Sequence, residues 1–299
     1  MLLVTGASGF LGSSVSLEAI ASGRPVVGAV HRSSGYQPGL RVVSSDLTAP
    51  SAAKALLSRI EPRWVVNCAA FTNVDECERD PEQARALNVD LPRMLAAACA
   101  EAKVGLVHIS TDSVFGGERG NYSEEDAPAP LNAYAQTKLD GERAVLEALP
   151  EALVLRTNFI GVSQSGRTGL ADWLASTLES GDRVQGFTDV TFAPLLTNEV
   201  ARIILAAIES RLQGLYHAAA RDACTKYDFA CRLSAALGFD TTIVARASIA
   251  EAGLTARRPL NTSLSSSRLE GALRRPMPPV DTAIAGYAAL HAARLASRL

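Results

Sequence analysis

The chain opens with an apolar run that leads into a glycine-rich turn, Val4-Thr5-Gly6-Ala7-Ser8-Gly9-Phe10-Leu11-Gly12. Glycines at a turn from strand to helix let a pyrophosphate approach the backbone, because no Cβ stands in its way. The free amides and the positive dipole end of the following helix face the same anion. The spacing is GxxGxxG rather than GxGxxG, so the prediction also depends on the context of strand, turn and helix. We therefore predict a dinucleotide site whose residues at this turn are Gly6, Ser8, Gly9, Phe10, Leu11 and Gly12.

Beyond this turn, short apolar runs alternate with longer helical patterns, which is typical of parallel strands joined by crossover helices. The runs are apolar at every position, and this indicates a sheet covered on both faces. The sequence thus predicts an α/β protein with a doubly wound parallel sheet. The expected strands are residues 2–4, 25–30, 41–43, 64–66, 105–109 and 153–155. The expected helices are residues 10–22, 52–60, 81–102 and 133–149.

The pattern changes after about residue 157, where glycine, serine and proline become frequent between the apolar runs. We predict a dinucleotide-binding domain over residues 1–157 and a smaller α/β region over residues 158–299 that binds the substrate. Residues 190–211 are expected to return to the first domain. Two further helices are expected at residues 198–210 and 227–237, and a proline-rich tail near residues 274–279.

Composition limits the class of partner. The 299 residues carry a formal net charge of -2, so there is no basic field for a nucleic acid or an anionic membrane. The sequence starts at Met1 without the pattern of a signal peptide and has no long apolar run, which favours a cytoplasmic protein. The five scattered cysteines are expected to be reduced thiols, and the four dispersed histidines predict no protein-bound metal.

The end of the second expected strand indicates which dinucleotide is bound. This strand runs into His31-Arg32-Ser33-Ser34 and offers no carboxylate to bond the ribose hydroxyls of NADH. Arg32 and Ser33 are instead predicted to hold a 2′-phosphate, which favours NADPH over NADH, although Arg32 also fits a solvated turn. After the third strand, Asp46 and Leu47 are expected at the adenine, where the carboxylate accepts from the amino group.

A phenol and an ammonium lie four residues apart in Tyr134-Ala135-Gln136-Thr137-Lys138, and so on one face of a predicted helix. A free phenol has a pKa of about 10, which a close positive charge lowers toward the working pH. Tyr134 is then expected to protonate a carbonyl oxygen as hydride arrives. Thr111 ends the fifth expected strand and is predicted to bond the same carbonyl. Chance spacing for the pair and a turn cap for Thr111 are the structural alternatives.

Several segments together resemble a known family, the extended short-chain dehydrogenases, and within it the dTDP-4-dehydrorhamnose reductase group. They keep the family order over nearly the whole chain. The matching segments are residues 4–12, 67–75, 110–115, 130–134, 138–142, 155–157 and 258–261. The resemblance implies a Rossmann-type fold and the reduction by NADPH of the 4-keto group of a nucleotide-linked 4-keto-6-deoxysugar, with dTDP as the expected nucleotide. Some relatives form dimers, so the resemblance leaves a homodimer as one possible oligomeric state.

The same resemblance implies roles for individual residues. Thr111, Tyr134 and Lys138 would be the catalytic trio, with Tyr134 and Lys138 also bonding the cofactor. Further cofactor contacts are implied at Asn67, Cys68, Ala69 and Ala70. The implied substrate residues are Thr72, Val74, Asp112, Ser113, Asn158 and Phe159. Ser113 replaces the tyrosine, and Asn158-Phe159 the tryptophan segment, of rhamnose-forming members, which puts the identity of the sugar in doubt.

Two alternatives stay open at this point. The first is a nucleotide-sugar epimerase or dehydratase on the same scaffold; the dehydratases carry an Asp-Glu pair after the threonine, where this chain has Asp112-Ser113. The second is a non-catalytic subunit that binds NADP, because the regulatory beta subunit of methionine adenosyltransferase is similar in sequence.

Overall fold

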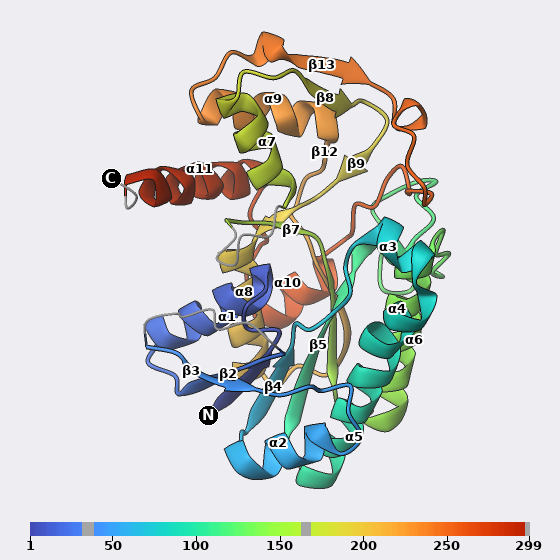
Figure 1. The fold of residues 1–299 in the computed structure, drawn as a ribbon, viewed down its shortest axis with the longest axis vertical. Coiled ribbons are helices and arrows are strands. Elements are labelled where there is room, and N and C mark those ends of the chain that lie inside the picture. The colour runs from blue at the N-terminus through green and yellow to red at the C-terminus, as the bar shows by residue number, and fades with distance from the viewer. Residues whose placement is uncertain (32–38, 163–168, 297–299) are drawn as a thin grey trace.

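A seven-stranded parallel sheet forms the centre of the computed structural model, which describes residues 1–31, 39–162 and 169–296 (Figure 1). The strand order is β11-β6-β5-β4-β1-β2-β3, and every neighbouring pair is parallel. This confirms the predicted α/β fold with a doubly wound sheet. The strands are β1 Leu2–Thr5, β2 Val26–Val30, β3 Arg41–Ser44, β4 Trp64–Asn67, β5 Gly105–Thr111, β6 Leu153–Thr157 and β11 Gly214–Ala218.

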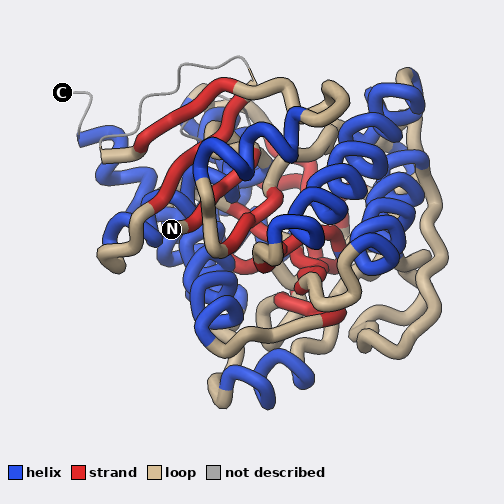
Figure 2. The backbone as a smooth tube through the Cα atoms, turned by 90° about the horizontal axis from the view of Figure 1, so that it is seen from below, coloured by secondary structure: helices blue, strands red, loops and turns tan. Residues whose placement is uncertain are grey.

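Helices cover both faces of this sheet (Figure 2). Successive strand residues point to opposite faces, so Val4 belongs to a core cluster with α1 and α8, whereas Leu3 belongs to a second cluster with α2, α5 and α6. Both faces of the sheet are therefore buried under helices, which explains the continuous apolar runs of the strands. The helices are α1 Phe10–Ala21, α2 Ala52–Ile60, α5 Leu91–Ala102, α6 Ala133–Ala148 and α8 Thr197–Glu209.

The prediction of a single helix over residues 81–102 is wrong. The structure has α4 Pro81–Arg85, a π-helical turn at Ala86–Asp90, and then α5. Pro92 has no amide hydrogen, so the carbonyl of Asn88 loses its helical partner. Gly141 of α6 packs against that carbonyl, since a Cβ there would lie 2.0 Å from the oxygen. π-helical turns of this kind are frequent near functional sites.

After β6 the chain builds a smaller layer above the carboxyl ends of the sheet (Figure 1). Its strands form three two-stranded sheets, in the pairs β7 with β10, β9 with β12, and β8 with β13. The tail expected near residues 274–279 is followed by a long helix, α11, whose buried face keeps helical spacing. The elements are β7 Phe159–Ile160, α7 Leu170–Glu179, β8 Val184–Phe187, β9 Thr191–Phe192, β10 Leu195–Leu196, β12 Cys224–Thr225, α9 Lys226–Ala236, β13 Val244–Ala247, α10 Ser267–Leu273 and α11 Val280–Ala296.

The chain returns to the sheet within this second half. Helix α8 packs against α1, and β11 pairs with β6 in parallel, with Ala218 opposite Thr157. The returning segment thus runs past residue 211, as far as residue 218. Among the helices of the described residues, none has both the length and the apolar character needed to cross a bilayer.

Candidate active site

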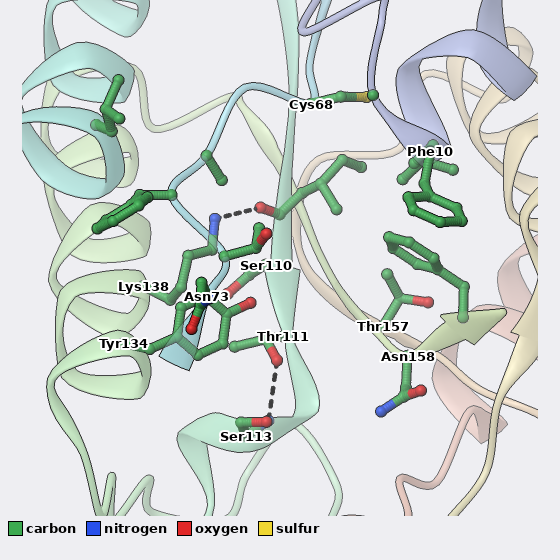
Figure 3. Close-up of a pocket in the computed structure, with 18 of the residues that line it drawn as sticks. Phe10, Cys68, Asn73, Ser110, Thr111, Ser113, Tyr134, Lys138, Thr157 and Asn158 are labelled. Atoms are coloured by element: carbon green, nitrogen blue, oxygen red, sulfur yellow. Dashed lines mark hydrogen bonds between the residues drawn. The ribbon is translucent and has the colours of Figure 1, made fainter. Parts of the chain in front are cut away.

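A cleft of about 930 Å³ opens at the carboxyl edge of the sheet (Figure 3). It lies where the strand order reverses, between the turn after β1 and the loop after β4, which is where doubly wound sheets bind ligands. Its volume is in the usual range for small-molecule sites. The cleft therefore brings together residues that are distant in the sequence.

Fourteen of the residues predicted for the site line this cleft: Gly9, Phe10, Leu11, Gly12, Cys68, Ala70, Thr72, Thr111, Asp112, Ser113, Tyr134, Lys138, Asn158 and Phe159. Seven other described residues that were predicted are not among its lining residues: Gly6, Ser8, Asp46, Leu47, Asn67, Ala69 and Val74. The predicted 2′-phosphate site at Arg32 and Ser33 lies outside the described residues.

The glycine turn is as tight as its sequence predicted. Gly6 has a φ of +62°, and a Cβ there would lie 2.8 Å from the amide nitrogen of Ala69. A Cβ on Gly12 would lie 2.2 Å from the carbonyl oxygen of Gly6. Gly9 precedes α1, whose first turn has no side-chain cap and no acidic residue. The amides at this helix end are thus open to an anion.

Asn67, implied as a cofactor contact, forms hydrogen bonds to neighbouring strands in the structure. Its amide oxygen accepts from the Thr5 hydroxyl at 2.6 Å and from the Ala69 amide at 3.3 Å. Its amide nitrogen lies 3.1 Å from Nδ1 of His108. The side chain therefore ties β1, β4 and β5 together below the cleft.

Asp46 and Leu47 also lie away from the cleft lining. The Asp46 carboxylate accepts from the amide and hydroxyl of Thr48 and lies 3.7 Å from Nε2 of His31. Leu47 is buried in the core cluster below α2. Their predicted role at the adenine stays a prediction.

The first turn of α6 places Tyr134 against the end of β5. The Asn132 side chain caps this helix by accepting from the Ala135 amide at 2.8 Å. Tyr134 then lies beside Thr111, whose hydroxyl accepts from the Ser113 amide at 3.1 Å and donates to Asp112 Oδ1 at 3.1 Å. Figure 3 shows the Tyr134 ring beside Thr111 and Lys138 at the same wall of the cleft.

The expected lowering of the Tyr134 pKa is wrong. Burial raises the pKa of this phenol to about 12, and the nearby Thr111 hydroxyl opposes that rise. The negative charge of Asp112 raises the pKa further. Desolvation is the largest of these causes, so Tyr134 keeps its proton throughout the neutral pH range.

Lys138 is 3% exposed, and its Nζ donates to the carbonyl oxygen of Ile109 at 2.7 Å. Burial lowers the pKa of this ammonium to about 8, although the Glu142 carboxylate acts to raise it. The side chain thus holds a positive charge at neutral pH within the same cleft as Tyr134.

A buried ion pair supports this arrangement from below. Arg156 of β6 donates to both oxygens of Glu142 on α6, from Nε at 2.9 Å and from Nη2 at 2.7 Å. Glu142 also accepts from the Ser110 hydroxyl, next to Thr111. Nη1 of Arg156 lies 3.5 Å from Nε2 of His217 on β11. The network fixes α6, and with it Tyr134 and Lys138, to three strands.

The π-helical turn supports the same side of the cleft as α6. The Asn88 side chain accepts from the Phe71 amide at 2.9 Å and donates to the Phe71 carbonyl at 3.0 Å. Its amide nitrogen also lies 3.1 Å from the Thr137 hydroxyl of α6. Asn88 thus joins the cleft loop after β4 to the helix that carries Tyr134 and Lys138. Nothing in the sequence pattern around residue 88 indicated this role.

Sequence reasoning missed eight residues that line the cleft: Phe71, Asn73, Glu76, Gln83, Leu87, Ile109, Ser110 and Thr157. Most of them flank predicted site residues in the loop after β4 and at the ends of β5 and β6. Their proximity to predicted neighbours was the only available signal. Gln83 and Leu87 carried none, because the break between α4 and α5 was not expected.

Four of the six predicted substrate residues gather at the ends of β5 and β6, namely Asp112, Ser113, Asn158 and Phe159. Asp112 accepts from the side-chain amide of Asn158 at 2.7 Å and from the Ser113 hydroxyl at 3.2 Å. Lys226 of α9 lies above the ring of Phe192, with Nζ 3.2 Å from the ring centroid. Burial lowers the pKa of Lys226 to about 8, and the negative charge of Asp112 acts to raise it. This end of the cleft is polar and closely hydrogen-bonded.

The described residues offer no preformed site for a metal ion. No group of three or more His, Cys, Asp or Glu side chains there is arranged to hold an ion. All five cysteines are free thiols. Burial raises the pKa of Cys68, the one that lines the cleft, to about 12, so it is a poor nucleophile.

Comparison with known proteins agrees with this geometry. Residues 1–291 match the RmlD substrate binding domain family. A probable low-salt glycan biosynthesis reductase, Agl14, of Haloferax volcanii is 37% identical over 96% of each chain. A probable dTDP-4,6-dihydroxy-2-methyloxan-3-one 4-ketoreductase of Streptomyces antibioticus is 36% identical over 90% of this chain and 88% of that protein.

A solved structure shares the whole architecture. The crystal structure of a dTDP-4-dehydrorhamnose reductase from Clostridium acetobutylicum superposes with a TM-score of 0.83, at 26% identity, over 97% of this chain and 98% of that one. A dinucleotide-type cleft on a doubly wound sheet, with Tyr and Lys on one helix, defines the class of protein. The chain belongs to the RmlD substrate binding domain family, the dTDP-4-dehydrorhamnose reductase-like proteins, as the sequence resemblance predicted.

Proposed function

We propose that the protein reduces the 4-keto group of a nucleotide-linked 4-keto-6-deoxysugar with NADPH, and that Tyr134 donates the proton. The observation that carries the proposal is the meeting of Thr111, Tyr134 and Lys138 in one cleft with the glycine turn. Relatives named as a 4-ketoreductase and as a dTDP-4-dehydrorhamnose reductase support the reaction and the class of substrate.

The residues present fit a dinucleotide. The turn at Gly6 and Gly12 has no space for a Cβ, and the amides at the start of α1 carry no side-chain cap. Gly9, Phe10 and Leu11 of this turn would hold the pyrophosphate against the helix end. When bound, NADPH supplies the hydride that the reduction requires.

Tyr134 acts as the acid in this proposal. A ketone that receives a hydride becomes an alkoxide, which is a much stronger base than a phenolate. Transfer of the phenolic proton is therefore favourable even from a group whose pKa is about 12. The raised pKa also guarantees that Tyr134 holds a proton to give at neutral pH.

Thr111 and Lys138 assist this transfer. Thr111 lies beside Tyr134 and lowers the pKa of the phenol, so its hydroxyl would stabilise the phenol oxygen once the proton has left. The Lys138 ammonium, held by the Ile109 carbonyl, adds a fixed positive charge to a desolvated wall. The two groups favour the anionic form of Tyr134 that follows proton donation.

The sugar is proposed to lie between Tyr134 and the polar end formed by Asp112, Ser113 and Asn158. The side chains of Asp112 and Asn158 are joined at 2.7 Å, so they present a preformed pair of donor and acceptor atoms to hydroxyl groups. Ser113 stands where rhamnose-forming members carry a tyrosine, and Asn158-Phe159 replaces their segment with the tryptophan. We therefore expect a sugar other than the one those members use.

The proposal is tested by the oxidation of NADPH, followed at 340 nm, with a panel of dTDP-4-keto-6-deoxysugars. We expect stoichiometric oxidation with at least one member of the panel and a product reduced at C4. Epimerisation without net oxidation would instead indicate the epimerase alternative. Binding of NADPH without oxidation, together with an altered partner enzyme, would indicate a regulatory subunit.

The pKa of Lys138 predicts the alkaline limb of the activity. Because this pKa is lowered to about 8, the ammonium is present below that pH and is lost as the pH rises through it. We expect kcat/KM to fall about tenfold per unit above pH 8, since the pKa of Tyr134, about 12, lies beyond this range. Initial rates between pH 6 and pH 10 measure the limb.

A second lysine provides the control for this assignment. Burial also lowers the pKa of Lys226 to about 8, so a limb near this pH is ambiguous in the wild type alone. Lys226→Met should keep the limb, and Lys138→Arg should move it upward, because a guanidinium stays charged. A limb that disappears in Lys226→Met and persists in Lys138→Arg contradicts the assignment.

A further inference from the structure

The hydroxyl of Thr157 is a buried polar group without a partner in the wall of the cleft. Thr157 is 3% exposed, and its Oγ1 makes no hydrogen bond in the described part of the chain. Two other buried side-chain atoms there share this condition, Nε2 of His108 and Nδ1 of His291, but neither residue lines the cleft. A buried hydroxyl without a hydrogen-bond partner is unfavourable. At a ligand site, an atom of the bound ligand can supply the missing hydrogen bond.

The position of Thr157 indicates which ligand group it meets. Thr157 ends β6 and stands opposite Thr111 in the register of β5 and β6, about one strand spacing of 4.8 Å away. Figure 3 shows Thr157 on the side of Phe10 and the glycine turn, across the cleft from Tyr134 and Lys138. The sugar carbonyl belongs to the Tyr134 side, which leaves Thr157 to the dinucleotide.

We propose that Thr157 is a positioning residue that hydrogen-bonds the carboxamide of the nicotinamide ring. This inference rests on the proposed function. The carboxamide stands on the ring carbon next to the one that releases hydride, so it must lie close to the ends of β5 and β6 when hydride reaches a carbonyl beside Tyr134. A carboxamide donates and accepts, as a threonine hydroxyl does, so the two groups are complementary.

The neighbours of Thr157 leave this role to its hydroxyl. The side-chain amide of Asn158 is already bonded to Asp112 at 2.7 Å. The side chain of Arg156 is held by Glu142 on the other face of β6. Thr157 lies between them in the sequence, lines the cleft and leaves its Oγ1 without a partner among the described residues.

The test compares two probes on two variants. NADPH carries the nicotinamide, whereas 2′-phospho-ADP-ribose has the same adenine and phosphates without it. We expect Thr157→Val to weaken the binding of NADPH about two- to tenfold, the usual effect of losing one neutral hydrogen bond. The affinity for 2′-phospho-ADP-ribose should stay unchanged. Thr157→Ser keeps the hydroxyl and should bind both probes as the wild type does. Isothermal titration calorimetry gives the six dissociation constants, one for each probe with the wild type and with each variant.

Stability provides an independent readout. Because the hydroxyl has no partner within the described chain, Thr157→Val should not lower the melting temperature of the ligand-free protein. Unchanged NADPH affinity in Thr157→Val, or an equal loss for both probes, overturns the inference. Failure of the wild type to bind NADPH at all would instead refute the proposed function, so the two failures are distinguishable.

Discussion

Replacement of Tyr134 by phenylalanine should lower kcat for the 4-keto substrate by about two to four orders of magnitude, the usual contribution of a positioned general acid. Without the phenol, the alkoxide must take its proton from water, which has no fixed place in the wall. The ring that packs beside Thr111 is retained, so NADPH should still bind. Stopped-flow rates and NADPH titration separate the two effects.

A matched variant guards against a general effect of removing a phenol. Tyr227 lies under Arg246 and does not line the cleft, so Tyr227→Phe should retain wild-type kcat. The loss of one buried hydroxyl in Tyr134→Phe should lower the free energy of unfolding by only about 1 kcal/mol. Wild-type kcat in Tyr134→Phe would rule out this residue as the proton donor.

Replacement of Arg156 by leucine should lower the free energy of unfolding by about 3–5 kcal/mol. The side chains of Arg156 and Glu142 are each 4% exposed, so the variant leaves a carboxylate in the core without its counter-ion. Native domains are stable by only about 5–15 kcal/mol, and the loss is a large share of that. Urea unfolding followed by circular dichroism measures it.

Two further variants sharpen this test. Arg143 forms an ion pair with Asp140 on the same helix, but the Arg143 side chain is 66% exposed. Arg143→Leu should therefore change stability by less than about 1 kcal/mol. The double variant with leucine at both Glu142 and Arg156 should recover much of the loss, because no buried charge is left alone. Equal effects of Arg156→Leu and Arg143→Leu would contradict this view of the pair.

The part of the fold that the sequence predicted best is the part with regular apolar spacing. Helix α2 was expected at residues 52–60 and is found there, and the six predicted strands all belong to the sheet. The break before α5 was not foreseen, because Pro92 at the start of a helix looks harmless until Gly141 is known to pack against Asn88. That contact joins distant segments and leaves no local signal.

The site was predictable only as far as local chemistry allows. The glycine turn and the Tyr134 and Lys138 spacing were visible because each is a short motif. The direction of the Tyr134 pKa was not, since it depends on how deeply the phenol is buried. Thr157 was passed over for a similar reason, because an unpartnered hydroxyl can be recognised only when every neighbour is placed.

The path of the chain between its two layers has a mechanical consequence. It leaves the sheet after β6, comes back through β10 into α8, and leaves again after β11. These crossings lie together, because β7 pairs with β10 and Ala218 stands opposite Thr157. Elsewhere between the two layers, the Arg258 guanidinium, from the second half of the chain, forms an ion pair with Asp75 of the first half at 2.9 Å. Any rotation of the smaller layer about the paired crossings that separates these two residues would have to break this ion pair.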